Sequence, residues 1–259
     1  MAIVIIVSCT SKKERLEKEI FDLEISDSSS SPKGMNELAD KYILYFKNFP
    51  KDTLSEKYLY KAFMFKYLTS HWNEALQLAD EYKNTYSQTE NLYNIYLKKA
   101  RIYNENIKNA DSATYYFMIC DGKIKFSTHE YRQAAIALEN WLKTSNINDS
   151  AKLANVSFTS AKYYQLCTDY EKSVKMYEET ATRFTKYDKS PQALSTAAFV
   201  CWNELKQLQK AKEYYELLIK KYPESQAAKE AKVILKENLL QKTDEELAEY
   251  LLKKSNSGI

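Results

Sequence analysis

Histidine and cysteine supply most metal ligands and many nucleophiles, and this sequence contains few of either. The two histidines, His71 and His129, have no second histidine or cysteine at the spacing of a zinc site. Acidic residues are numerous, but they are mixed with lysine in the manner of solvated helix faces, and no pair stands out by its spacing. We therefore expect neither a metal site nor a pair of catalytic carboxylates. No CxxC spacing occurs among Cys120, Cys167 and Cys201. We expect each of these cysteines to be buried in an apolar helix.

Motifs that depend on glycine are also missing. The chain has only three glycines, so it contains no GxGxxG sequence, no phosphate-binding P-loop and no GxSxG elbow. These are the usual scaffolds for nucleotide binding and for hydrolase chemistry. We expect no cofactor, no small-molecule substrate and no enzymatic activity.

The charge is balanced and evenly distributed. Lys and Arg total 38 and Asp and Glu total 35, which gives a formal net charge of +3 without a basic block. Nucleic-acid binding usually requires a concentrated basic stripe, so we do not expect a nucleic-acid partner. The apolar run over residues 2–7 is far shorter than the ~20 residues that span a bilayer.

The start of the chain is the one place where a cysteine stands in a chemically suggestive context. The order Ile6-Val7-Ser8-Cys9 resembles a bacterial lipobox, in which the cysteine thiol takes a diacylglycerol and becomes the mature N-terminus. Buried acyl chains contribute ~0.8 kcal/mol per CH₂, so several chains hold a protein firmly at a membrane. The resemblance implies that residues 1–11 are a signal and anchor.

This signal is shorter than usual. Its charged and apolar regions are abbreviated, which we attribute to a start codon assigned downstream of the true one or to trimming. The implied location is the cell envelope, as an outer-membrane lipoprotein that faces the periplasm or the exterior, with membrane contact through the lipid on Cys9. The alternative is that Cys9 is an ordinary buried residue and that the protein is a soluble cytoplasmic adaptor.

Small residues recur along the chain in pairs 12 or 13 residues apart. These pairs are Ala62 with Ala75, Ala100 with Ala113, Ala161 with Ser173, and Ala198 with Ala211. A small residue on each helix of a hairpin lets the two backbones approach closely. The interval from Ala113 to Ser173 is longer than the 38 residues found elsewhere, so we expect an extra helix within residues 120–144.

Helix signals agree with stacked hairpins. Four hydroxyl residues each precede a glutamate by three positions, as in a capping box: Thr53, Ser127, Thr168 and Thr243. The expected helices cover residues 12–24, 35–48, 53–69, 73–86, 90–105, 108–119, 128–144, 151–167, 169–184, 190–206, 209–221, 225–241 and 244–254.

The alternation of small and aromatic residues, followed by the segment Tyr222–Ala231, resembles tetratricopeptide repeats (TPR) of the bacterial envelope type. Such repeats occur in outer-membrane assembly lipoproteins and in the tol-pal system protein. The resemblance covers about residues 35–242. It implies an all-α fold, an α-α superhelix or TPR-like solenoid of antiparallel helix hairpins, that acts as a non-catalytic protein-protein interaction scaffold for assembly of a membrane or division complex.

On this basis we expect three regions. Residues 1–11 are the truncated lipoprotein signal and anchor, and residues 12–34 are an N-terminal helix with a flexible Ser-rich linker. Residues 35–254 form the TPR-like helical repeat domain, in which the last helix covers the open hydrophobic end.

A partner is expected on the concave side, which the first helix of each repeat lines in this family. The positions one and four residues after each first small residue are Phe63, Lys66, Arg101, Asn104, Lys162, Gln165, Phe199 and Trp202. We expect a protein or peptide partner whose carboxylates pair with the three cations while the aromatic pair provides an apolar anchor. The alternative is that these residues serve only packing and solubility.

Overall fold

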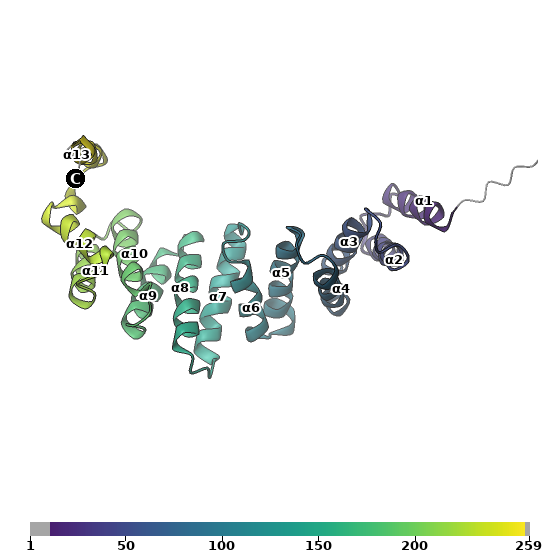
Figure 1. Cartoon of the computed structure of the whole chain (residues 1–259), viewed down its shortest axis with the longest axis horizontal. Helices are drawn as coiled ribbons and strands as arrows, with labels where there is room; N and C mark the ends of the chain where they lie inside the picture. Colours follow the sequence, from purple (N-terminus) through teal and green to yellow (C-terminus); the bar gives the residue numbers. More distant parts are fainter. Residues whose placement is uncertain (1–10, 257–259) are drawn as a thin grey trace, which may run out of the picture. The chain divides into compact units, whose positions relative to one another are not determined.

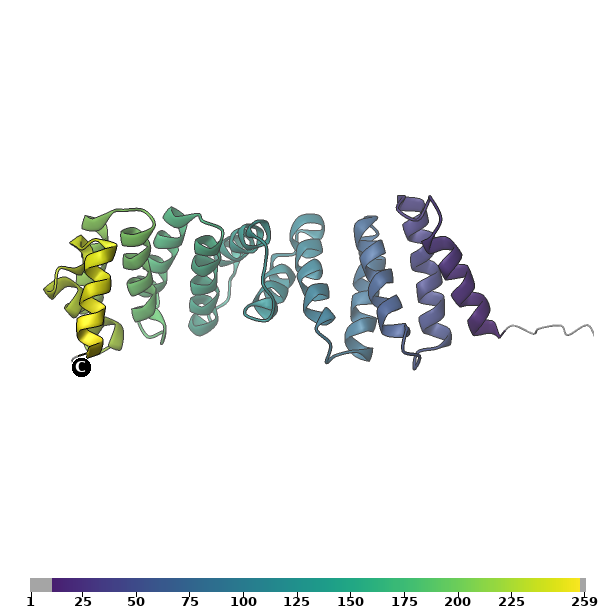
Figure 2. The same ribbon diagram turned by 90° about the horizontal axis from the view of Figure 1, so that it is seen from above.

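The computed structural model describes residues 11–256, with side chains described up to residue 254, and this part of the chain contains helices and turns but no strand. Within each half of the chain, Figures 1 and 2 show helices that follow one another in chain order. The α-helices are α1 (Lys12–Glu24), α2 (Pro32–Asn48), α3 (Ser55–Leu68), α4 (Trp72–Thr85), α5 (Asn91–Arg101), α6 (Ala110–Cys120), α7 (Thr128–Thr144), α8 (Ser150–Leu166), α9 (Tyr170–Arg183), α10 (Ser190–Asn203), α11 (Leu208–Lys221), α12 (Gln226–Lys236) and α13 (Asp244–Asn256). A π-helical turn, η1 (Ile102–Ile107), continues α5, and a 3-10 turn, η2 (Leu239–Gln241), follows α12.

The chain divides into two compact units, residues 1–124 and 125–259. The division falls within residues 120–144, where the sequence predicted a break in the repeat, and α7 is the predicted extra helix. The repeat region expected over residues 35–254 therefore spans both units. In each unit helices pack against their neighbours in the sequence, which confirms the all-α fold of sequential helix hairpins.

The recurring small residues lie where hairpin helices touch. All eight of them have no exposed surface: Ala62, Ala75, Ala100, Ala113, Ala161, Ser173, Ala198 and Ala211. Because an Ala or Ser side chain is short, the paired backbones approach closely and the larger neighbouring side chains fill the flanks. The repeat predicted from the sequence is thus a repeat of close helix contacts.

The serine-rich segment before α2 is a structured turn, and our expectation of a flexible linker was wrong. The Ser31 amide donates to the Ser28 carbonyl at 2.9 Å, and Ser31 Oγ accepts from the Gly34 amide at 3.0 Å as the N-cap of α2. A Cβ atom on Gly34 would lie 2.0 Å from the Ser28 carbonyl oxygen, so only glycine fits there. The hydrogen bonds of Ser31 therefore start α2 three residues earlier than predicted.

Helix α1 belongs to unit 1. Its Leu16 and Ile20 are buried against α2. Tyr42 Oη donates to Glu24 Oε1 at 2.5 Å, and Lys13 Nζ forms an ion pair with Asp52 Oδ2 at 2.5 Å. The Lys13 ammonium and the Leu54 amide hold the pKa of Asp52 at about 2, below its usual 3.8.

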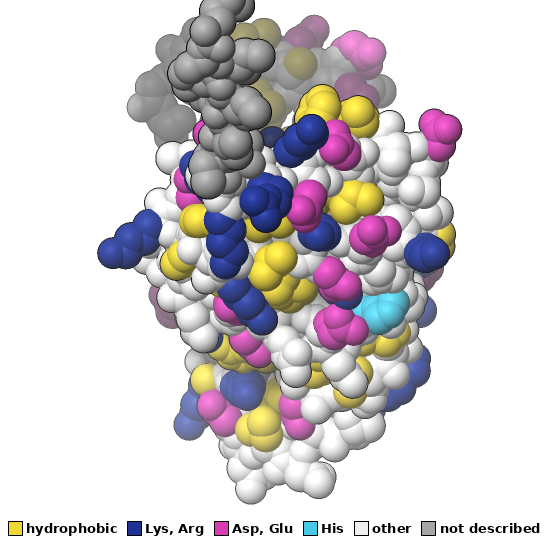
Figure 3. Space-filling model, turned by 90° about the vertical axis from the view of Figure 1, so that its right-hand side faces the viewer, with side chains coloured by type: hydrophobic (Ala, Val, Ile, Leu, Met, Phe, Trp, Pro, Cys, Tyr) yellow, Lys and Arg dark blue, Asp and Glu magenta, His cyan; other side chains and the backbone are white. Residues whose placement is uncertain are grey.

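On the face of unit 1 shown in Figure 3, basic, acidic and apolar side chains are intermingled. This distribution agrees with the even spread of charge along the sequence.

The hairpin turns use left-handed backbone at residues that are not glycine. Ser70, Lys108, Thr168 and Lys206 have φ between 56° and 63° and share the spacing of the small residues. At Thr168 the next amide, that of Asp169, donates to the Tyr164 carbonyl at 2.9 Å, which is the pattern of a Schellman motif. Each of these positions carries a side chain where glycine is preferred.

Two predicted capping boxes form and two do not. Ser127 and Thr243 each exchange hydrogen bonds with the glutamate three residues later. The predictions for Thr53 and Thr168 were wrong. Helix α3 begins at Ser55 beyond a turn in which Asp52 accepts the Leu54 amide, and Thr168 is the left-handed turn residue itself.

Tyrosine provides both core volume and a polar contact between helices. Tyr82, Tyr164 and Tyr214 are buried, and their hydroxyls donate to Glu56, Glu139 and Glu178. Burial and the bond to Glu56 raise the pKa of Tyr82 to about 12. These three tyrosines are therefore part of the repeat core.

The end of unit 2 is covered differently from our expectation. Leu239 and Leu240 of η2 are buried, and η2 packs on α11 and α12. Helix α13 instead exposes Leu251 and Leu252, each at 64%. Within residues 11–256, none of the helices has the length and apolar character needed to cross a bilayer.

Candidate partner-binding groove

In unit 1, two of the predicted partner contacts lie in the interior. Phe63 has no exposed surface, and the Lys66 side chain is only 5% exposed. Lys66 Nζ forms ion pairs at 2.8 Å with Asp40 of α2 and with Glu74 of α4. Helix α3 is packed between α2 and α4, so these two side chains lie inside unit 1 and present almost no surface to a partner.

The other two predicted residues of unit 1 are half-buried. Arg101 Nε lies 3.3 Å from Glu105 Oε1, and its guanidinium stands 6.0 Å from the centroid of the Tyr67 ring. Asn104 lies in the π-helical turn η1. The structure does not bring these two residues together with Phe63 and Lys66 on one exposed surface.

In unit 2, the predicted residues are more accessible. Phe199 is 43% exposed and meets Trp202 edge-on, with 6.2 Å between ring centroids. Lys162 is half-buried over the Tyr163 ring, and Gln165 accepts a hydrogen bond from Tyr177 Oη at 3.2 Å. The aromatic pair on α10 therefore keeps a surface that another molecule can reach.

Among the cysteines, Cys9 lies outside the described residues. Cys120, Cys167 and Cys201 are free and buried, as predicted. Burial raises the pKa of Cys120 to about 12, which keeps this thiol protonated and unreactive.

The sequence did not indicate a hollow of unit 2, a groove of about 560 Å³ between α7 and α9. Its lining is Glu139, Leu142, Lys143, Ser145, Lys172, Lys175, Met176, Glu179 and Arg183. A second hollow of about 420 Å³ shares Leu142, Ser145 and Arg183 and extends to Asn148, Ser150 and Phe184. We call the two together the α7–α9 groove.

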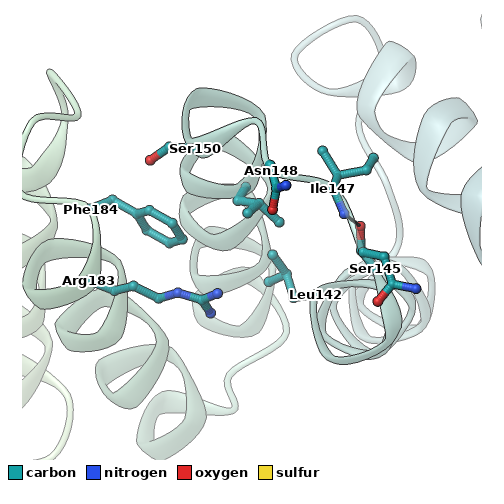
Figure 4. Close-up of a pocket in the computed structure, with 9 residues that line it drawn as sticks. Leu142, Ser145, Ile147, Asn148, Ser150, Arg183 and Phe184 are labelled. Carbon is teal, nitrogen blue, oxygen red and sulfur yellow. Dashed lines mark hydrogen bonds between the residues drawn. The ribbon is translucent and has the colours of Figure 1, made fainter.

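Figure 4 shows how the end of this groove is built. Arg183 leaves the last turn of α9 and points toward Leu142 of α7, with Phe184 beside it. The α7–α8 loop forms the opposite wall, where the Ile147 amide donates to Ser145 Oγ at 3.3 Å. Asp149 caps α8 by accepting the Lys152 amide at 3.0 Å, which fixes where the loop ends. The groove is therefore a junction of two helices and one loop.

The floor is apolar and the rim is cationic. Met176 and Phe184 are each only 7% exposed, and Leu142 is half-buried. Residues three, four, seven and eight positions apart on a helix share a face, so Lys172, Lys175 and Arg183 line the groove with Met176. The resulting surface joins apolar contact area to positive charge.

The two carboxylates of the groove differ in how far they are neutralised. Glu139 accepts a hydrogen bond from Lys143 Nζ at 2.6 Å and another from the Tyr164 hydroxyl. Burial raises the pKa of Glu139, but these two contacts outweigh it and lower the pKa below its usual value. Among the described residues, the Glu179 carboxylate has one long ion pair, with Arg183 at 3.9 Å.

The lysines of the α7–α9 groove have fewer close ionic partners than Glu139. Lys172 lies 3.6 Å from Asp169, and Lys175 forms no hydrogen bond or ion pair with any residue that the structure describes. Four cations and two carboxylates line the larger hollow, so it carries an excess of positive charge. Only the i+3 and i+4 spacing within α9 was visible in the sequence, because the opposite wall comes from a helix and a loop about 30 residues earlier.

Comparison of the sequence with known proteins does not assign the chain to a family. None of the protein-family models matches it, and no curated protein is similar to it.

Proposed function

We propose that this protein is a non-catalytic protein-interaction scaffold of the tetratricopeptide-repeat kind, and that the α7–α9 groove receives a segment of a partner protein. The observation that carries the proposal is the groove itself, an open hollow of about 560 Å³ in which Leu142 and Met176 lie among charged side chains. Partner segments commonly bind in grooves between packed helices, where apolar side chains supply contact area and polar groups fix the register.

A groove-filling substitution tests this role without changing the charge. Asn148 is exposed on the groove wall, so Asn148→Trp places an indole in the smaller hollow. Asn94→Trp adds the same side chain at an exposed position of α5 in unit 1 and is the matched control. Purified protein immobilised as bait recovers its binding partners from an envelope extract. We expect Asn148→Trp to lose partners that wild type and Asn94→Trp retain, and equal recovery by all three would refute the groove as the binding site.

We further propose that a lipid on Cys9 anchors the scaffold to the outer membrane, where it assists assembly of a membrane or division complex. The lipobox-like order of residues 6–9 supports this. Metabolic labelling with a radioactive fatty acid, followed by membrane fractionation, should show label and membrane association that Cys9→Ala abolishes and Thr10→Ala preserves. Unlabelled, soluble wild-type protein would instead indicate an adaptor without an anchor.

A further inference from the structure

We propose that the α7–α9 groove selects an acidic partner segment in which two carboxylates flank an apolar side chain. The inference rests on the proposed function and adds the chemistry of the bound segment. It follows from the charge, the floor and the dimensions of the groove.

The charge of the rim favours carboxylates. Lys175 forms no ion pair within the described residues, and the ion pair of Arg183 with Glu179 is long, at 3.9 Å. Both side chains are exposed, so they reach a ligand without first losing a close internal ion pair. Complementary charge of this kind sets orientation and excludes segments of the wrong sign.

The apolar side chains of the groove favour a bound segment that has an apolar side chain between its two carboxylates. Met176 and Phe184 are nearly covered, while half-buried Leu142 leaves apolar surface open toward the groove. A purely acidic segment would leave this surface in contact with water. An aliphatic side chain placed on Leu142 removes this surface from water, which favours the bound state.

The spacing of the cations suggests a register. Lys175 and Arg183 are eight residues apart on α9, which corresponds to about 12 Å along the helix axis. An extended peptide advances about 3.3 Å per residue, so carboxylates four residues apart span about 13 Å. Residues one, three and five of an extended segment face the same side. The matching pattern is therefore acid, any residue, apolar, any residue, acid.

Glu179 provides an internal check on this reasoning. It lies on α9 between Lys175 and Arg183, and its carboxylate repels an acidic ligand while it competes for Arg183. Removal of its charge in Glu179→Gln should strengthen binding of an acidic segment. A groove that merely attracts any apolar peptide would not respond in this way.

The test measures fluorescence anisotropy of three labelled nonapeptides with the full-length protein. The probe GSESLSESG carries the proposed pattern, GSKSLSKSG reverses its charge, and GSESASESG shortens its apolar side chain. We expect the first to bind, the second to show no binding, and the third to bind several-fold more weakly. An increase from 50 to 300 mM NaCl should weaken binding of the first, because the contacts are ionic.

The charge variants complete the test. Lys175→Glu with Arg183→Glu should weaken binding of GSESLSESG about tenfold or more, and Glu179→Gln should strengthen it about two- to fivefold. The control is Lys125→Glu with Lys229→Glu, two exposed lysines of unit 2 outside the groove with the same change in net charge. Circular dichroism verifies that every variant keeps its helix content.

Either of two results would overturn the inference: no binding of GSESLSESG by wild type, or equal affinity for the groove variant and the control pair. Loss of partners in Asn148→Trp together with such a result would leave the groove as a binding site and reject only its acidic preference. Undiminished partner recovery by Asn148→Trp would reject the binding site itself.

Discussion

Ser173 provides a sharp test of how the small residues stabilise unit 2. It occupies the position that Ala75, Ala113 and Ala211 hold in the other hairpins, and it is fully buried. Its hydroxyl finds no hydrogen-bond partner in the described structure. A buried hydroxyl without a partner costs about 1–3 kcal/mol, and alanine is also the better helix former by about 0.5 kcal/mol. Ser173→Ala should therefore raise the free energy of unfolding by about 1.5–3.5 kcal/mol.

Ser160 is the matched control for this substitution. It is also fully buried in unit 2, but its Oγ donates to the Ala135 carbonyl at 3.1 Å. Ser160→Ala loses a hydrogen bond worth about 0.5–1.5 kcal/mol and regains part of it through helix propensity, so its effect should lie between zero and about −1 kcal/mol.

Urea denaturation, combined with hydrogen exchange of the α8 and α9 amides, measures both variants. The free energies of unfolding of the two variants should differ by about 1.5–4.5 kcal/mol, with Ser173→Ala the more stable. If Ser173→Ala is no more stable than wild type, or if both variants shift alike, then the unpaired hydroxyl is not the source of the effect and the reasoning fails.

Three further predictions concern the turns, the ion pair of α1 and the core. Thr168 is β-branched and has φ of +62°, a conformation that costs an L-residue about 1–2 kcal/mol. Thr168→Gly should therefore stabilise the protein by about 0.5–1 kcal/mol, once the larger backbone entropy that glycine loses on folding is subtracted. A lower urea midpoint for this variant would contradict the assigned turn. Because the folded pKa of Asp52 is about 2 and lies below the usual 3.8, its ion pair contributes stability above that usual value and loses it as the pH falls through about 2. The stability difference between wild type and Asp52→Asn should accordingly be constant at neutral pH and shrink in acid, and a difference that grows in acid would reverse the assignment. Phe63→Ala should lower the free energy of unfolding in urea by about 3–5 kcal/mol because this side chain is fully buried. Phe199→Ala should lower it by less than about 1 kcal/mol. Similar losses in the two variants would show that burial does not distinguish these positions.

The sequence alone determined the helices and the hairpin contacts, because both depend on local pattern. The paired small residues and the capping-box spacings lie within one or two helices, so they can be read along the chain. The extra helix over residues 128–144 followed from the same count, since one interval between small residues was too long.

Tertiary structure decided which side chains face solvent, and this is where the sequence-based site was least accurate. Phe63 and Lys66 were expected in a groove, but α3 is covered on both sides, and Asp40 and Glu74 neutralise the buried ammonium of Lys66. The equivalent positions on α10, Phe199 and Trp202, remain at least partly exposed. A position in the repeat therefore does not fix burial, because burial depends on the neighbouring helices.

The α7–α9 groove likewise required the folded chain. Leu142 and Arg183 lie 41 residues apart in the sequence, and neither belongs to a recognisable motif. Only the packing of α7 and α9 against α8, and the path of the loop at residues 145–149, bring their side chains to one hollow. Helix formation is a local property of the chain, whereas a binding surface arises from side chains that only long-range packing places together.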